Sequence, residues 1–88
     1  MYKVSIDKKA AKELKRINKI WQQKILSFLK KIDNSPDPRI FGKSLKGNLQ
    51  GLWRYRVGDY RIICQINDDE LMVLVVKTGH RKGVYNKK

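Results

Sequence analysis

The sequence predicts an α+β fold with the order β-α-α-β-β-β, in which a helical hairpin packs on one face of a small, mostly antiparallel sheet. The prediction rests on a change of hydrophobic period near the middle of the chain. Before residue 33, most apolar side chains recur every three or four positions, as on amphipathic helices; from Leu52 onward they alternate or run together, as in strands. The 88 residues are expected to form a single domain, residues 1–88, around one modest core.

The first half of the chain predicts a strand followed by two helices. Residues 2–6 alternate apolar and polar, which is typical of a half-buried strand. Asp7 follows in the position of a helix N-cap, where its negative charge also suits the positive end of the helix dipole. Two apolar stripes with helical spacing come next, separated by a break at Asn18 and Lys19. The stripes are Ala10, Ala11, Leu14 and Ile17, then Trp21, Ile25, Phe28, Leu29 and Ile32.

Turn residues mark the passage from helices to strands. Residues 33–38 contain two prolines, which cannot continue a helical hydrogen-bond ladder, so the second helix ends there. Residues 39–51 are then expected to form a basic loop. Residues 52–57 alternate as a strand does, and Gly58 with Asp59 predicts a two-residue hairpin turn with glycine where a type II′ turn requires it.

The last predicted strand lies at the centre of the sheet. Residues 60–66 form the return strand of the hairpin, and residues 67–69 form the next turn. Residues 71–77 are apolar on both faces, which is typical of a strand covered on both sides. The segment 77–88 begins at the end of this strand and contains no acidic residue. A cationic, polar tail is therefore expected beside the end of a core strand.

The charge of the chain limits its function. The formal net charge is +13 and the pI is near 10.1. Because repulsion among so many positive charges disfavours the compact state, we expect a polyanionic partner. Nucleic acid is the first candidate, an acidic protein the second, and an anionic membrane the third and weakest. No apolar run approaches the roughly 20 residues that span a bilayer, and the N-terminus lacks the apolar region of a signal peptide.

Cofactor chemistry is not expected. Cys64, the single cysteine, cannot form an internal disulfide, which favours the reducing cytoplasm and fits a packing role in the core. With His80 as the single histidine, a dedicated His/Cys metal site is close to excluded. The glycines form no Walker or dinucleotide-binding pattern. The sequence thus predicts a cytoplasmic protein with no metal and no small-molecule cofactor.

Three arginines are predicted to share one face of the sheet. Pairing across the Gly58 turn places Arg56 opposite Arg61, with Arg54 nearby on the same face. Like charges opposite each other destabilise a sheet unless an anion lies between them. Because the helices must cover the apolar face, we expect the arginines to form a cationic patch on the uncovered face. Guanidinium groups suit phosphate because they donate two hydrogen bonds at once. The alternative is three ordinary solvated strand positions.

The tail supplies candidate acid/base groups. His80 carries the one side chain that titrates near neutrality unaided, and it precedes Arg81. Tyr85 has two interpretations. Its ring could simply hold the tail against the core, or guanidinium groups around it could lower the pKa of its phenol and make it a proton acceptor.

The second half of the chain resembles the RelE/ParE toxins of bacterial type II toxin–antitoxin systems. The pattern L-x-G, W-R-x-R-x-G-D-Y-R, G-H-R and V-Y occurs in this order within residues 43–47, 52–57, 58–65 and 78–85. The strand and two helices at the start agree with the fold of that family. The closing G-H-R-x-x-V-Y is more similar to the RelE branch, which cleaves mRNA, than to the ParE branch, which poisons gyrase.

The resemblance implies a ribosome-dependent endoribonuclease that cleaves mRNA in the ribosomal A site without a metal. The ribose 2′-OH attacks the adjacent phosphate, which leaves a 2′,3′-cyclic phosphate and a free 5′-OH. By this resemblance Arg61 stabilises the charge on the phosphorane. Arg81 binds the phosphate and assists the leaving 5′-oxygen. Tyr85 stacks on a base or takes the 2′-OH proton, and His80 is a candidate acid or base.

Further basic residues are assigned to RNA binding by the same resemblance: Arg54, Arg56, Lys43, Lys46 and Lys82. Some relatives carry lysines at the positions of Arg54 and Arg56, and arginine cannot usefully give up its proton. A general base is therefore not expected at either position. Such a site would depend on the ribosome to hold the mRNA in a geometry ready for attack.

The expected partners are the ribosome with its rRNA, mRNA, and a cognate acidic antitoxin protein. The antitoxin is expected to dock an amphipathic segment on an apolar groove or to cover the basic face. Two alternatives to the nuclease stay open. One is a ParE-like inhibitor of DNA gyrase on the same fold, and the other is a non-catalytic basic module that binds RNA or the ribosome.

Overall fold

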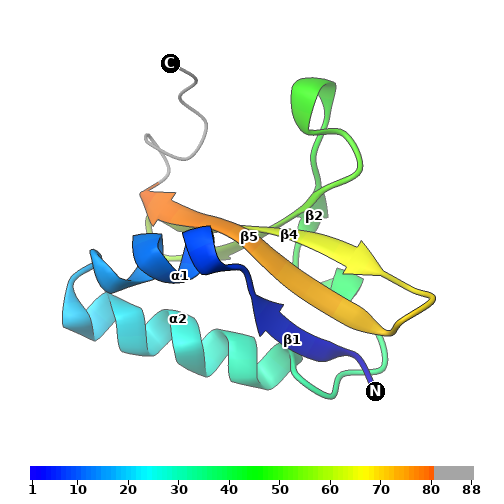
Figure 1. The fold of residues 1–88 in the computed structure, drawn as a ribbon, viewed down its shortest axis with the longest axis horizontal. Coiled ribbons are helices and arrows are strands. Elements are labelled where there is room, and N and C mark those ends of the chain that lie inside the picture. The colour runs from blue at the N-terminus through cyan, green and yellow to red at the C-terminus, as the bar shows by residue number, and fades with distance from the viewer. Residues whose placement is uncertain (81–88) are drawn as a thin grey trace.

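A computed structural model describes residues 1–80 and shows two helices packed on one face of a five-stranded sheet (Figure 1). Strand β1 spans Lys3–Ile6, and helices α1 and α2 span Lys8–Lys15 and Lys19–Ile32. The remaining strands are β2 (Lys43–Ser44), β3 (Trp53–Val57), β4 (Tyr60–Asn67) and β5 (Met72–His80). Two 3₁₀ turns, η1 (Pro38–Phe41) and η2 (Gly47–Leu49), flank β2. The predicted α+β fold with a helical hairpin on one face is confirmed.

The sheet has the order β1-β5-β4-β3-β2. Strand β1 pairs with β5 in parallel, and all other neighbours are antiparallel. The apolar strand β5 pairs with neighbours on both sides, so it is an interior strand, but it lies next to the edge strand β1 while β4 occupies the predicted central position. The helices cover the face of β5 that carries Val73 and Val75, whereas Met72 and Leu74 on the other face are only half-buried, so the predicted cover on both faces is incomplete. A register shift in β4 and β5 at Ile63 and Cys64 marks a bulge, which leaves Val76 without a partner on β4.

The helices begin where the sequence predicted. The Asp7 carboxylate accepts a hydrogen bond from the backbone N–H of Lys9 at 3.3 Å, and the Asn18 side chain accepts one from Ile20 at 2.9 Å. Each side chain satisfies one of the N–H groups that a helix start leaves without a partner. Asn18 therefore separates α1 from α2, as expected from the break in the apolar stripe.

One core lies between the helices and the sheet. The buried cluster consists of Ala10, Leu14, Ile25, Leu29, Ile32, Tyr55, Ile62, Cys64, Val73 and Val75. Cys64 is fully buried and lies in this cluster, which confirms its predicted packing role. Burial raises the pKa of the Cys64 thiol, so it stays protonated and unreactive.

The structure corrects three boundaries. The predicted basic loop, residues 39–51, contains most of η1, all of η2 and the additional strand β2. Strand β5 continues to His80 rather than ending at Lys77, so His80 belongs to the sheet. Leu71 adopts a positive φ of 51° in the turn before β5 and lies outside that strand. A two-residue strand has too few positions to show a period, which is why β2 escaped the sequence pattern.

A polar clasp holds the end of the sheet farthest from the β3–β4 turn. The Arg39 guanidinium donates to both oxygens of the Asp68 carboxylate at 2.9 and 3.0 Å, and the Tyr2 hydroxyl donates to the same carboxylate at 2.6 Å. These bonds lower the pKa of Asp68 and raise that of Tyr2. The clasp joins the N-terminus, η1 and the β4–β5 turn, so it fixes the segment that leads into β2.

Candidate anion-binding site

The strand register brings the predicted arginines onto one face of the sheet. Arg56 on β3 pairs with Arg61 on β4, and Arg61 in turn lies opposite Gly79 on β5. Arg54 lies two positions before Arg56 on β3, so it faces the same side. We call the surface formed by Arg54, Arg56 and Arg61 the arginine face. The predicted register of the hairpin is thereby confirmed.

The turn that sets this register also fits its prediction. Gly58 has a φ of +60°, whereas Asp59 is not among the residues with positive φ in the described part of the chain. A positive φ at the first central position alone distinguishes a type II′ turn from a type I′ turn. The Trp21 ring packs directly over Gly58, so a β-carbon there would run into the indole. Helix α2 therefore supports the hairpin that carries the arginines.

The three arginines differ in burial, although the sequence predicted that all of them would lie on an uncovered face. Only Arg56 is exposed; Arg54 is half-buried, and Arg61 retains 5% of its exposure. The expectation of an open patch is therefore wrong for Arg61. The neighbouring Ile63 is also buried, although it lies outside the core cluster. A one-dimensional pattern gives the face to which a side chain points but not how deeply that face is covered.

The arginine face lacks counter-charge in the described part of the chain. Within residues 1–80, the Nε and Nη1 atoms of Arg61 and the Nε of Arg54 are buried without a hydrogen-bond partner. The ion pairs among these residues are Arg39–Asp68 at 2.9 Å and Lys77–Glu13 at 3.4 Å, and neither involves the arginine face. A buried guanidinium without a partner is costly, and a bound anion would remove that cost.

Basic residues continue beside the arginine face. Lys43 on β2 pairs with Arg54, so this exposed lysine faces the same side of the sheet. Lys46 is exposed in the segment between β2 and η2, which projects from the sheet in Figure 1. A hollow of about 290 Å³ lies at this edge, and its lining is Ile40, Phe41, Gly42, Lys43, Arg54 and Arg56. The hollow and the Arg56–Arg61 pair share Arg56.

His80 is placed apart from the arginines. It pairs with Tyr60, and its ring meets the Tyr60 ring edge to face at a centroid distance of 5.7 Å. Tyr60 also contacts Trp21 of α2 at 5.6 Å, so this stack lies on the side of the sheet that carries the helices. The strand alternation thus directs His80 away from the arginine face. The other predicted tail residues, Arg81, Lys82 and Tyr85, lie outside the described residues.

Helix α1 anchors the end of β5. The Glu13 carboxylate accepts a hydrogen bond from the backbone N–H of Thr78 at 2.9 Å and pairs with the Lys77 ammonium at 3.4 Å. The Thr78 hydroxyl donates to the carbonyl of Ala10 at 3.2 Å. Because β1 ends before this part of β5, Glu13 occupies an edge that would otherwise lack a partner. The sequence gave no signal for this contact, which joins residues 65 positions apart.

The described part of the site can stabilise negative charge and offers little acid/base chemistry. Burial raises the pKa of the Tyr55 phenol, whose hydroxyl donates to the carbonyl of Pro38 at 2.8 Å. Tyr55 is therefore a structural residue and not a proton acceptor. Among residues 1–80, no three His, Cys, Asp or Glu side chains gather to hold a metal ion. Within the same residues, no helix is long and apolar enough to cross a membrane.

A separate apolar groove runs between α2 and the end of β3. It encloses about 440 Å³ and is lined by Ile20, Gln23, Lys24, Ser27, Phe28, Lys31, Arg56 and Val57. Ile20 is 64% exposed, and the Lys24 ammonium lies over the Trp21 ring at 4.7 Å. No acidic residue is among the lining residues, and three of them are basic. The groove therefore suits a segment that combines apolar and acidic side chains.

Comparison with known proteins assigns the chain to a family. Residues 4–85 match the sequence model of the family described as the ParE toxin of the type II toxin–antitoxin system parDE. The chain is 31% identical over 87 residues to Toxin RelE of Mycobacterium tuberculosis, across 96% of this chain and 86% of that protein. It is 33% identical over 55 residues to Toxin RelG of the same organism, across 62% of this chain and 63% of RelG.

A solved structure agrees with these matches. The toxin–antitoxin complex RelBE2 of M. tuberculosis contains a chain with a TM-score of 0.82 and 25% identity, covering 91% of this chain and 98% of that one. The family model carries the ParE name, while the relatives carry the RelE and RelG names. What they share is the superfamily. The chain therefore belongs to the RelE/ParE toxin superfamily of type II toxin–antitoxin systems.

Proposed function

We propose that this toxin is a metal-independent endoribonuclease that cleaves mRNA in the ribosomal A site. The observation that carries the proposal is Arg61, a buried guanidinium that faces Arg56 and has two nitrogens without a partner among residues 1–80. A phosphodiester fits this arrangement because its charge increases during cleavage. Preorganised donors are worth most where charge develops in the transition state.

The proposed reaction is transfer of the phosphoryl group to the neighbouring ribose oxygen. The 2′-oxygen forms a bond to phosphorus as its proton leaves, and the bond to the 5′-oxygen breaks as that oxygen gains a proton. The products are a 2′,3′-cyclic phosphate and a 5′-OH. Arg61 stabilises the phosphorane charge, and Arg56 offsets the charge of the non-bridging oxygens.

Proton transfer is assigned to the tail. Arg81 would bind the phosphate and assist the leaving oxygen, Tyr85 would stack on a base or accept the 2′-OH proton, and Lys82 would contact the RNA backbone. The position of His80 on the helix side favours a supporting role through Tyr60 over direct proton transfer. Because the described part of the site is cationic and lacks a carboxylate, the proposal relies on the ribosome to position the mRNA.

The proposed protein partner is an acidic antitoxin. It is supported by the solved relative, which forms a toxin–antitoxin complex. The apolar groove with its basic rim of Lys24, Lys31 and Arg56 would accept an amphipathic acidic segment. Arg56 lines the groove and also belongs to the arginine face, so an occupant of the groove would compete with RNA for this residue. A cytoplasmic location follows from the proposed target.

The test is primer extension on a defined mRNA in programmed ribosomes with the purified full-length chain. A new stop inside the A-site codon, absent on naked mRNA, is expected. Arg61→Ala should lower the cleavage rate by about 100-fold or more, the usual effect of losing one transition-state donor. The matched control is Lys30→Ala, which removes one positive charge from the exposed side of α2 and should cleave normally.

Two outcomes would overturn the proposal, the first in the role of Arg61 and the second in the nuclease activity itself. Full activity of a folded Arg61→Ala protein would remove Arg61 from the mechanism. No cleavage by folded wild-type protein would favour the second candidate, inhibition of DNA gyrase, to which the ParE name of the matching family model points. A gyrase supercoiling assay with the same preparations separates that candidate from a module that only binds RNA. Salt-sensitive ribosome binding without cyclic-phosphate product would identify the binding module.

A further inference from the structure

We propose that the hollow lined by Ile40, Lys43 and Arg54 is a nucleotide subsite, which seats the base next to the phosphate held by Arg56 and Arg61. The inference rests on the proposed function and extends it from the scissile phosphate to one neighbouring nucleotide. Its chemical class is a single-stranded nucleotide, with the base against the aliphatic wall of the hollow and the phosphate on its basic wall.

The first support is the position of Ile40. This side chain is 71% exposed, the most exposed of the large hydrophobic residues among those described. Its neighbours hold it in place. The Trp53 indole donates to the carbonyl of Arg39 at 3.1 Å, and the Phe41 ring packs edge to face on Phe28 at 6.4 Å. A single exposed aliphatic residue is ordinary on a loop, but here the backbone on both sides is anchored to the fold.

The second support is the shape of the hollow. Gly42 lies so close to β3 that a β-carbon there would run into the carbonyl of Arg54 and the Tyr55 ring. The chain therefore approaches the sheet closely at Gly42, and the exposed Ile40, two residues earlier, lies at the side of the hollow. A volume of about 290 Å³ has room for a planar base but not for a folded segment of protein.

The third support is the charge of the opposite wall. Lys43 and Arg54 form a cross-strand pair of like charges, and the Arg54 Nε is buried without a partner among residues 1–80. No acidic residue lines the hollow. Arg54 and Arg56 are about 7 Å apart along the strand, because a strand rises roughly 3.4 Å per residue. This spacing is close to one nucleotide step of an extended strand, so neighbouring phosphates would meet neighbouring arginines.

These features combine the two elements of single-strand recognition. A basic track follows the backbone, and an apolar surface supports a base, whose flat face is itself largely apolar. The phosphate contacts would be independent of sequence, whereas the Ile40 contact exists only when a base is present. That difference gives the proposal a test that does not need cleavage.

The test is fluorescence anisotropy of the full-length chain with a labelled hexanucleotide whose 2′-hydroxyl groups are methylated, so that it cannot be cleaved. A second hexanucleotide has the same backbone but no bases. Ile40→Ala should raise Kd about fivefold for the first probe and leave it unchanged for the second. Ile40→Phe should lower Kd for the first probe, since base stacking on an aromatic ring is stronger. Leu26→Ala, an exposed aliphatic residue on α2, is the matched control and should alter neither.

The basic wall is tested with the same probes. Lys43→Ala should weaken binding of both hexanucleotides alike and reduce the slope of log Kd against log salt by about 1. The substituted residues, Ile40, Leu26 and Lys43, are all exposed. Thermal melting followed by circular dichroism checks that each variant is folded.

Three results would overturn the subsite. Equal changes of Kd in Ile40→Ala and Leu26→Ala would show that Ile40 makes no specific contact with the base. A change of Kd in Ile40→Ala that is also seen with the hexanucleotide without bases would show that Ile40 acts on the fold. Unchanged binding of both hexanucleotides in Ile40→Ala and in Lys43→Ala would show that the hollow holds no nucleotide. The nuclease is judged separately on programmed ribosomes: cleavage without these base effects rejects the subsite alone, and base effects without cleavage reject the nuclease alone.

Discussion

At the scale of single residues, the defining feature is a charge placed where it disfavours folding. Arg61 is buried opposite Arg56, and within residues 1–80 no acid pairs with either. The acid nearest in the sequence is Asp59, which lies exposed in the adjoining turn. Positions that harm stability without an evident compensating contact are typical of functional sites. The free toxin is therefore expected to be less stable than its fold allows.

Replacing Arg61 should separate stability from activity. Arg61→Met fills similar space without a charge, so we expect the free energy of unfolding to rise by about 1–3 kcal/mol while mRNA cleavage is lost. Urea denaturation of both proteins measures the difference. Lys30→Met is the control, because this lysine is exposed on α2, on the helix side of the sheet, and its loss should change stability by less than about 0.5 kcal/mol. A clear fall in the stability of Arg61→Met would mean that Arg61 is well paired in the folded protein.

At the scale of elements, the β3–β4 hairpin and helix α2 act as one unit. The hairpin turn requires a positive φ at Gly58, and Trp21 leaves no room there for a side chain. Trp21 also stacks on Tyr60, the first residue of β4. The turn, the helix and the start of β4 thus fix the register that places Arg56 opposite Arg61.

Two glycine substitutions test this coupling. Gly47→Ala introduces strain from a φ of +64° with open space around it, and should cost about 1 kcal/mol. Gly58→Ala combines similar strain with overlap on the Trp21 ring, and should cost about 2–4 kcal/mol. Denaturant melts give both values. Equal costs would show that the Trp21 contact adds nothing to the turn.

Sequence patterns were sufficient for the elements whose signals are local. The Asp7 cap, the Asn18 break and the Gly58 turn each depend on neighbours within a few positions, and all three are present. Because the turn fixes pairing, Arg56 opposite Arg61 followed from the sequence as well. These predictions succeeded because their physical causes act within one turn of chain.

The remaining features depend on contacts between distant segments. Strand β2 exists because Lys43 and Ser44 meet β3, and Glu13 reaches Thr78 across the fold. The burial of Arg61 likewise depends on how much of the sheet face is covered. The position of His80 on the helix side follows from β5 continuing in register to its pairing with Tyr60. No local pattern contains this information.

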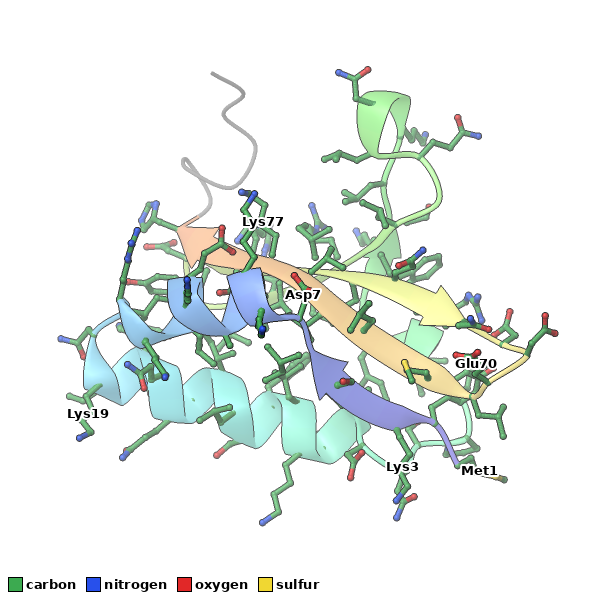
Figure 2. All side chains as sticks on the ribbon, in the orientation of Figure 1. Met1, Lys3, Asp7, Lys19, Glu70 and Lys77 are labelled. Atoms are coloured by element: carbon green, nitrogen blue, oxygen red, sulfur yellow. The ribbon has the colours of Figure 1, made fainter. Side chains whose placement is uncertain are left out.

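At the scale of the whole molecule, the charges are unevenly distributed. Most acids lie near the start of β1 and the β4–β5 turn: Asp33, Asp37, Asp68, Asp69 and Glu70. Figure 2 shows Glu70 and Lys77 at opposite ends of β5. The arginine face lies near the end of the sheet away from most acids, next to the β3–β4 turn. This separation would orient the toxin as it approaches an anionic target and speed its association.

The net charge of +13 makes a prediction about salt. Ion pairs weaken as salt rises, but repulsion among unpaired cations weakens too, and residues 1–80 contain two ion pairs against many more basic side chains. The melting temperature of the free chain should therefore rise between about 0.02 and 0.5 M NaCl. Sulfate at equal ionic strength should raise it further, because a divalent anion can bind between Arg56 and Arg61. Arg61→Met should keep the response to NaCl and the general stabilisation by sulfate, and should lose the additional part that is due to anion binding at Arg61. A melting temperature that falls with NaCl would mean that the two ion pairs outweigh the repulsion, and an equal sulfate effect in both proteins would place anion binding away from Arg61.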